Sequence, residues 1–202
     1  MDCSKVGGLI FQLRKEKGMT QRQLADRLNI SNKTVSKWEC GNGAPDLSLW
    51  EELSAVLGAD ILKLLQGELA PNRRDVGKID NIRFYVCPKC GNILTSTGKA
   101  GVTCCGRRLL PLSPSTDTAG HDIAVEETDG DYYVTVDHDM SKAHYICFAA
   151  CVYDDRIWFQ RLYPEQSPAF RIPIMKGGGS LYLYCTEHGL FKFQRSGLYP
   201  FS

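Results

Sequence analysis

Nine cysteines and four histidines are the residues of this chain best suited to binding a metal. Four of the cysteines form a close set, in which a pair three residues apart precedes an adjacent pair: Cys87, Cys90, Cys104 and Cys105. Gly91 follows the first pair and allows backbone amides to turn toward the sulfur atoms. Four thiolates make a tetrahedral site for iron or zinc. The spacing predicts such a site without distinguishing the two metals.

All four histidines fall after residue 120. They are His121, His138, His144 and His188, and Cys185 stands three residues before the last of them. Imidazole is the commonest metal ligand among side chains, and thiolate binds several of the same ions. The crowding of these residues indicates metal ligation.

The composition is that of an ordinary soluble globular protein, with 43% hydrophobic and 23% charged residues among 202. No apolar run approaches the roughly 18 residues of a membrane span. The first residues lack the basic stretch and apolar core of a signal peptide. We therefore expect a cytoplasmic protein with no membrane contact. Because disulfides are rare in that reducing compartment, the many cysteines are better explained by metal binding.

The formal net charge of +1 conceals a polarised N-terminal region. Residues 14–37 carry seven basic and two acidic side chains, which gives +5. Residues 38–68 carry six acidic side chains and one lysine, which gives −5. A basic face of this kind is typical of a nucleic-acid-binding domain.

Residues 5–66 have the apolar spacing of short helices that share one small core. Side chains that favour helix N-termini stand at Thr20, Ser31, Asp46 and Asp60. The expected helices are one that ends near Gly18, followed by residues 21–28, 32–39, 46–57 and 61–66. This pattern predicts an all-α bundle of five helices.

Residues 69–81 show no sustained apolar period and are expected to be a linker. Short runs typical of strands follow at residues 123–127, 132–136, 145–153, 157–162, 170–174, 181–185 and 190–194. Asp129-Gly130 between the first two runs is a strong hairpin signal. About seven short strands with turns between them predict an antiparallel, immunoglobulin-like β-sandwich.

The stretch Thr-Gln-Arg-Gln-Leu-Ala-Asp-Arg-Leu-Asn-Ile-Ser-Asn-Lys-Thr-Val-Ser-Lys-Trp-Glu at residues 20–39 closely resembles the helix-turn-helix of phage repressors of the Cro and C1 (XRE) type. The resemblance covers about residues 5–66. It implies that the second helix of the pair lies in the major groove of a double-stranded DNA operator and that the protein is a homodimer. The open alternative is a helical bundle that contacts other proteins.

Carried over position by position, the resemblance implies two groups of DNA-binding residues. Asn32, Lys33 and Lys37 match base-reading positions, where Asn suits adenine and Lys suits guanine. Arg14 and Gln21 match positions that contact the DNA backbone, where a helix N-terminus and a cation meet phosphate.

From residue 82 onward the order of motifs resembles desulfoferrodoxin, the two-iron superoxide reductase. Cys-Pro-Lys-Cys-Gly at 87–91 and Cys-Cys-Gly at 104–106 are similar to the desulforedoxin domain, a small rubredoxin-like iron site. His-Asp-Met-Ser-Lys-Ala-His-Tyr-Ile at 138–146 and Cys-Thr-Glu-His-Gly at 185–189 are similar to the family's histidine and cysteine motifs. The resemblance covers nearly all of residues 82–195.

The family binds iron through four imidazoles in a plane and one axial thiolate, with the sixth position open to superoxide. The resemblance implies that His121, His138, His144 and His188 are the planar ligands and that Cys185 is axial. It further implies one-electron reduction of superoxide to hydrogen peroxide, with a rubredoxin-like protein as a potential electron donor. The thiolate directs electron density toward the open side, as it does in thiolate-ligated haem.

One departure from the family concerns the charges around this site. The family usually carries Glu-Lys before the first ligand histidine, and the lysine attracts superoxide and helps to protonate the product. Here those positions are Ala119 and Gly120, and Asp122 and Asp139 replace prolines that follow histidines. Both changes weaken the attraction of an anion. Lys142 in the neighbouring loop is a candidate substitute for the missing lysine.

These patterns predict four segments: a helix-turn-helix domain at 1–68, a linker at 69–81, a desulforedoxin-like metal knuckle at 82–112, and a superoxide-reductase-like sandwich at 113–202. Three functions stay open. The first is a superoxide reductase coupled to DNA binding, the second is a transcription regulator that senses superoxide, peroxide or iron without turnover, and the third is a structural role for the metals. Cys3 and Cys40 have no assigned role, and Cys147 and Cys151, four apart on one strand, are expected on one face in the core.

Overall fold

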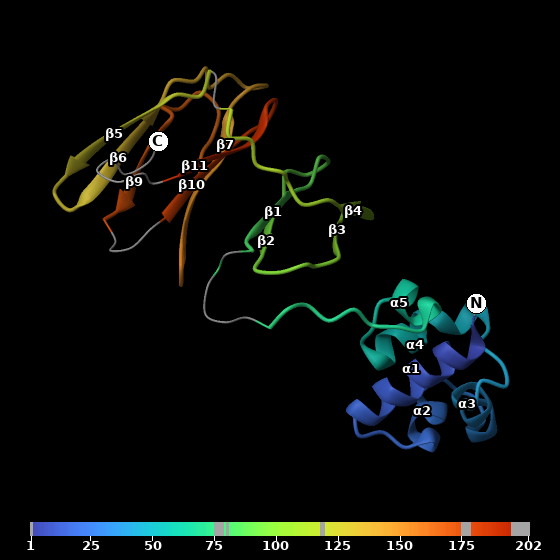
Figure 1. Ribbon diagram of the computed structural model, residues 1–202. Coiled ribbons are helices and arrows are strands. Elements are labelled where there is room, and N and C mark those ends of the chain that lie inside the picture. Colours follow the sequence, from blue (N-terminus) through green and yellow to red (C-terminus); the bar gives the residue numbers. More distant parts are fainter. Residues whose placement is uncertain (1, 75–78, 80, 118–119, 175–178, 195–202) are drawn as a thin grey trace. The chain divides into compact units, whose positions relative to one another are not determined.

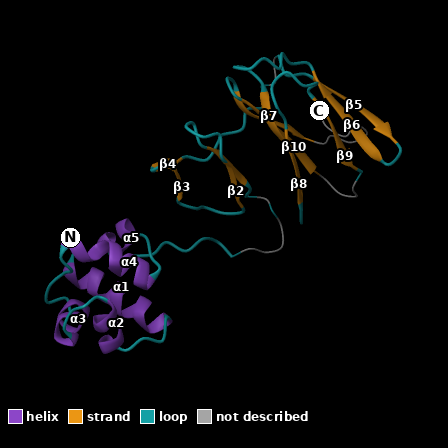
Figure 2. Ribbon diagram, turned by 180° about the vertical axis from the view of Figure 1, so that it is seen from behind, coloured by secondary structure: helices purple, strands orange, loops and turns teal. Residues whose placement is uncertain are grey.

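The computed structural model describes residues 2–74, 79, 81–117, 120–174 and 179–194. Ala119 and part of the expected linker lie outside the described residues. The chain divides into two compact units, Met1–Pro71 and Asn72–Ser202 (Figure 1). Figure 2 shows the helices confined to the first unit and the strands to the second. Within the described part of the chain, no helix has the length and apolar character needed to span a membrane.

Five helices form the first unit, as predicted. They are α1 (Cys3–Glu16), α2 (Gln21–Arg27), α3 (Asn32–Glu39), α4 (Trp50–Leu57) and α5 (Ile61–Gln66). Thr20 caps α2 reciprocally, because its hydroxyl accepts from Gln23 N–H while the Gln23 side chain accepts from Thr20 N–H. Ser31 caps α3 by accepting from the N–H of Thr34. These two caps fix where the helix-turn-helix pair begins.

The fourth helix begins with a 3-10 turn. The turn is Leu47–Leu49, and α4 starts at Trp50. The Asp46 side chain makes no capping hydrogen bond, whereas the Trp50 indole donates to the carbonyl of Pro45 at 3.2 Å. Asp46 is the residue before this continuous helical segment, and its carbonyl accepts from the N–H of Leu49 at 2.9 Å, so the expectation that Asp46 opens the fourth helix is confirmed.

Close backbone contact joins α1 to the end of α3. A Cβ atom at Gly7 would lie 1.9 Å from the carbonyl oxygen of Trp38, so only glycine fits there. Val35 and Trp38 point into the shared core with Leu24 and Ala25, as predicted. The position of α3 is therefore set by direct packing against α1.

A buried ion pair and its hydrogen bonds connect α1, α2 and α3. Arg14 on α1 donates from Nε and Nη2 to the Glu39 carboxylate at 2.6 and 2.8 Å, and from Nη1 to the Met19 carbonyl at 2.6 Å. Gln21 on α2 donates its amide to the same carboxylate at 2.8 Å. Burial opposes ionisation of Glu39, but the hydrogen bonds from Arg14 and Gln21 outweigh it and lower its pKa.

This network corrects the role expected for Arg14. Its side chain is only 4% exposed and all three of its guanidinium nitrogens are bonded within the domain, so the predicted contact with a DNA phosphate is wrong. Gln21 is half-buried and shares the network, and its contact with DNA stays a prediction.

The second unit consists of short strands. They are β1 (Arg83–Val86), β2 (Ile93–Ser96), β3 (Val102–Cys104), β4 (Arg107–Leu109), β5 (Ile123–Thr128), β6 (Asp131–Val136), β7 (Ile146–Tyr153), β8 (Ile157–Arg161), β9 (Ala169–Pro173), β10 (Gly179–Cys185) and β11 (Gly189–Gln194). The last seven match the predicted runs closely. The first four were not predicted, because strands of three or four residues hold too few apolar positions to show an alternation.

The seven longer strands form two antiparallel sheets that share one core. One has the order β11-β10-β7-β8 and the other β5-β6-β9. Their inward side chains, among them Val134, Ile172, Leu181 and Phe193, make up a single buried cluster. The antiparallel arrangement is confirmed, whereas immunoglobulin-like connectivity stays a prediction.

The hairpin between β5 and β6 confirms the turn read from the sequence. Thr128 pairs with Asp131, so Asp129 and Gly130 form a two-residue turn with φ values of 42° and 90°. Positive φ at both positions is what such a turn requires.

The first residues of β7 form a bulge, which changes the prediction made for Cys147 and Cys151. Against β10, Phe148 pairs with Tyr184 but Ile146 pairs with Cys185, so one residue of β7 is left over. Cys151 lies in the core between the sheets, but Cys147, although buried, is not part of that cluster. The bulge interrupts the alternation, and the expectation that both cysteines share one face is therefore wrong.

We predict that Arg14→Ala lowers the free energy of unfolding by about 3–5 kcal/mol, since it leaves the buried Glu39 carboxylate without its cation. Urea titration followed by helical circular dichroism measures the change, with exposed Arg22→Ala, which does not act on Glu39, as the control. Because the pKa of Glu39 is lowered in the folded chain, the pair's contribution is present at neutral pH and is lost as the pH falls through the acidic range. Equal urea midpoints for the two variants would show that the pair does not stabilise the fold.

Candidate functional site

Five potential ligands gather at one end of the two sheets. His121 stands just before β5 and His138 just after β6, at the end where Ile123 pairs with Val136. His144 precedes β7, Cys185 ends β10 and His188 lies in the turn before β11, at the end where Cys185 pairs with Ile146 and Gly189. Strand pairing thus brings together residues that are up to 67 positions apart.

The ring nitrogens of the histidines point toward one another. His138 Nε2 lies 3.0 Å from His144 Nε2, which lies 3.2 Å from His188 Nδ1. The Cys185 sulfur lies 3.5 Å from both His138 Nε2 and His188 Nδ1. His121 completes the set, because its ring centre is 4.9 Å from that of His138 and 5.0 Å from that of His188. One donor atom from each of the five residues lies within 4.8 Å of every other.

These distances fit a metal ion bound at the centre of the set. With metal–nitrogen bonds of about 2.1 Å, neighbouring ligands at right angles have nitrogens roughly 3 Å apart. The two measured nitrogen–nitrogen distances, 3.0 and 3.2 Å, agree with that geometry. The donor set of imidazoles and one thiolate suits iron, zinc or copper.

The protonation of His138 also favours a metal. Burial comes first, and the charges of the three neighbouring imidazoles add to it, so the pKa of His138 falls to about 4. The imidazole is therefore neutral at physiological pH, which is the form that binds metals.

Hydrogen bonds fix the loop that carries His144. Thr186 donates its backbone N–H to the Tyr145 carbonyl at 3.0 Å and its hydroxyl to the Ala143 carbonyl at 3.1 Å, and the same hydroxyl accepts from Tyr145 N–H. Ser141 Oγ accepts from the N–H of His144 at 3.1 Å. Sequence analysis missed both hydroxyl residues, because nothing in their type or spacing distinguishes them from surface Ser and Thr.

An aromatic ring holds His121 in place from the β11 side. The Phe191 ring lies 4.1 Å from the His121 ring, and His121 is 2% exposed. Stacking of this kind restricts the imidazole to one orientation.

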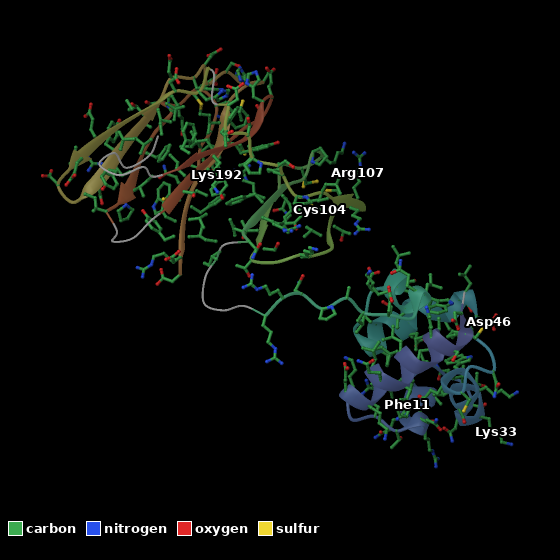
Figure 3. All side chains as sticks on the ribbon, in the orientation of Figure 1. Phe11, Lys33, Asp46, Cys104, Arg107 and Lys192 are labelled. Atoms are coloured by element: carbon green, nitrogen blue, oxygen red, sulfur yellow. The ribbon has the colours of Figure 1, made fainter. Side chains whose placement is uncertain are left out.

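The four cysteines of the other set come together around two short hairpins. Cys87 follows β1, and Gly91 N–H donates to its carbonyl at 2.9 Å to close a tight turn with Cys90. Cys104 pairs with Arg107 across β3 and β4, near one another in Figure 3, and Cys105-Gly106 form the two-residue turn between them with φ of 50° and 71°. The Cys90 and Cys104 sulfurs are 3.6 Å apart. All four lie within 4.8 Å of one another.

The four thiols cannot all ionise without a cation. Backbone N–H groups of Cys90 and Lys89 lower the pKa of Cys87 to about 6. The neighbouring sulfurs raise the pKa of Cys105 to about 12. A bound metal ion offsets this mutual repulsion, and sulfurs about 3.8 Å apart are what tetrahedral metal–sulfur bonds of about 2.3 Å require.

The charges near the histidine set do not favour the approach of an anion. Lys142 is 80% exposed, and its ammonium lies 3.7 Å from Glu165, so its charge is already paired. Asp139 is exposed beside His138. Gly120 has a φ of 75°, a conformation that a lysine side chain would strain. The role of Lys142 as a substitute cation stays a prediction.

On the helical unit, the predicted base-reading residues are accessible. Asn32, Lys33 and Lys37 on α3 are all exposed, and Figure 3 shows Lys33 at the outer surface of the unit. Each can reach a partner without disturbing the core beneath α3.

We predict that Cys87→Ser removes metal from the four-cysteine set and leaves metal in the histidine set, because no residue is shared between them. Metal content by mass spectrometry, together with the absorption of each site, measures the outcome. Cys147→Ser, a buried cysteine outside both sets, is the matched control. Loss of both metals from Cys87→Ser alone would mean that the two sites do not form independently.

Comparisons with known proteins agree with both halves of this description. A family model described as helix-turn-helix (HTH_3) matches residues 10–64. The HTH-type transcriptional activator BcrR of Enterococcus faecalis is 41% identical over 81 residues, which cover 37% of this chain and 40% of that protein.

The remainder of the chain matches a different group. The desulfoferrodoxin of Desulfarculus baarsii is 31% identical over 121 residues, which cover 56% of this chain and 96% of that protein. The solved superoxide reductase of Treponema pallidum aligns with a TM-score of 0.47 at 17% identity, over 55% of this chain and 95% of that one. The chain belongs to the desulfoferrodoxin family and carries a helix-turn-helix domain of the HTH_3 type at its N-terminus.

Proposed function

We propose that this chain binds DNA through its helical unit and reduces superoxide to hydrogen peroxide at an iron held by His121, His138, His144, His188 and Cys185. The observation that carries the proposal is the convergence of five donor atoms within 4.8 Å at one end of the sheets. Membership of the desulfoferrodoxin family supports iron as the metal.

Iron bound here would supply the single electron that superoxide accepts. The protein residues hold it: four neutral imidazoles bind a divalent ion without adding charge, and the buried Cys185 thiolate adds one negative charge. An ion that binds six ligands would have room for one small anion beside the five protein donors. Solvent supplies protons to the product, because His188 and Glu187 are exposed at this end of the sheets.

For the four-cysteine set we propose iron, with zinc as the alternative metal. Iron there can pass electrons from a rubredoxin-like donor, whereas zinc would only stabilise the two hairpins. The domain boundaries that go with this proposal are 1–68, 69–81, 82–112 and 113–202.

The helical unit is proposed to recognise a double-stranded operator. Asn32, Lys33 and Lys37 are its exposed base-reading residues on α3. If the chain is a homodimer, the operator is an inverted repeat with half-sites about one helical turn apart, or a multiple of it.

A second function, sensing without turnover, has one observation in its favour. The charges that would attract superoxide are weak at this site, since Lys142 is paired with Glu165 and Asp139 adds a negative charge. In that case iron would respond to superoxide, peroxide or iron supply and alter the binding of DNA. Superoxide consumption with and without operator DNA separates the two functions.

We predict that the iron-loaded protein reduces superoxide and that Asp139→Asn does so about twofold faster at low salt. Two unit charges about 8 Å apart interact by about 0.5 kcal/mol in water, which corresponds to about twofold in rate, and salt screens the interaction. Pulse-generated superoxide followed by stopped-flow absorption measures both rates. Cys185→Ser should lose the thiolate-to-iron absorption and nearly all activity. A parent protein with intact iron and thiolate absorption but no reaction would leave sensing as the function.

We predict that Lys37→Ala and Asn32→Ala each weaken binding to a specific operator by about 1–3 kcal/mol, if each reads a base edge. Half-buried Lys63→Ala on α5 is the control for loss of a positive charge. Fluorescence anisotropy with labelled operator and random duplexes, at several salt concentrations, separates base reading from phosphate contact. Absence of salt-dependent DNA binding would make the helical unit a protein-contact module.

A further inference from the structure

The turn between β10 and β11 places one carboxylate beside the histidine set. Cys185 pairs with Gly189, so Thr186, Glu187 and His188 form a three-residue turn that ends at a glycine with φ of 85°. Thr186 bonds to the backbone on both sides of His144. This turn therefore fixes the distance between its own side chains and the His144 ring.

Glu187 lies on the outer side of that ring. His144 Nε2 faces the other donors, at 3.0 and 3.2 Å from two of them, and its Nδ1 lies 4.0 Å from the Glu187 carboxylate. The contact places a carboxylate beside the His144 nitrogen that faces away from the other donors.

We propose that Glu187 is a positioning residue of the metal site, which orients the His144 imidazole with Nε2 toward the metal and strengthens it as a donor. The inference rests on the function proposed above. A carboxylate beside the second nitrogen of a metal-bound imidazole fixes the tautomer and makes the ring a better ligand. Glu187 does so on the only ring nitrogen of His144 that the other donors leave accessible.

The contact is of moderate strength. At 4.0 Å it is longer than a hydrogen bond, and the Glu187 side chain is 57% exposed. A bridging water or a small rotation of the side chain closes the distance. The effect on metal binding should therefore lie at the lower end of the roughly 10–100-fold range known for partners of metal ligands.

Three variants test the role of Glu187. Glu187→Gln keeps the size of the side chain and removes its charge, and Glu187→Asp keeps the charge. Glu127→Gln is the matched control, because this exposed glutamate lies six residues from His121 along β5, about 20 Å away. Two measurements are made on the full chain: the affinity of the histidine site for Co²⁺, by competition with a chelator, and the midpoint potential of bound iron.

Glu187→Gln is expected to weaken Co²⁺ binding about tenfold and to raise the midpoint potential, because the lost negative charge had stabilised the ferric form. Glu187→Asp should lie between this variant and the parent, and Glu127→Gln should match the parent. Equal affinity and potential for Glu187→Gln and Glu127→Gln would overturn the proposal. A parent chain that binds no metal at the histidine set would instead overturn the proposed function, so the two failures are distinct.

Discussion

The lone pairs of ring nitrogens 3.0 and 3.2 Å apart, with a thiol sulfur 3.5 Å from two of them, repel one another unless a proton or a metal ion lies between them. The fold has to maintain this arrangement, and its other features follow from that need. All five donors stand at strand ends or in short turns, where strand pairing determines their positions. Cys185 follows Leu181 and Leu183 on the inward face of β10, and the bulge in β7 opposite it leaves this alternation intact.

The helical unit also holds crowded polar groups, but there a side chain and not a metal ion balances them. There a buried carboxylate, Glu39, is matched by the Arg14 guanidinium from another helix, and no metal is needed. Buried ion pairs stabilise a fold only weakly, but this one connects α1 to the end of α3, the second helix of the helix-turn-helix pair. Each unit therefore brings together polar side chains that would be unfavourable if buried without a partner. Their pairing fixes the relative positions of elements that are distant in sequence.

The two clusters of potential metal ligands could be predicted because ligation imposes residue types and local spacings on the sequence. Cys-x2-Cys and Cys-x2-His are visible without a structure, and the helices showed in the spacing of Leu24, Val35 and Trp38. What could not be predicted depends on partners far away in the chain. The burial of Arg14 requires Glu39, which is 25 residues later, and the support of His144 by Thr186 spans 42 residues. Every residue of β7 is buried, so its sequence shows no alternation from which a bulge could be predicted. The face on which Cys147 lies could therefore not be predicted either.

Thermodynamic linkage restricts how DNA binding and iron chemistry can be combined in one chain. If oxidation of the iron weakens operator binding tenfold, then the operator must shift the iron potential by the equivalent of about 1.4 kcal/mol, or about 59 mV for one electron. A sensor needs such coupling. A reductase that turns over continually gains nothing from it, because its iron would pass through both oxidation states in every cycle and would move the protein on and off the operator. Turnover and sensing are therefore compatible only if reduction by the electron donor is slow, so that the oxidised iron persists when superoxide is abundant.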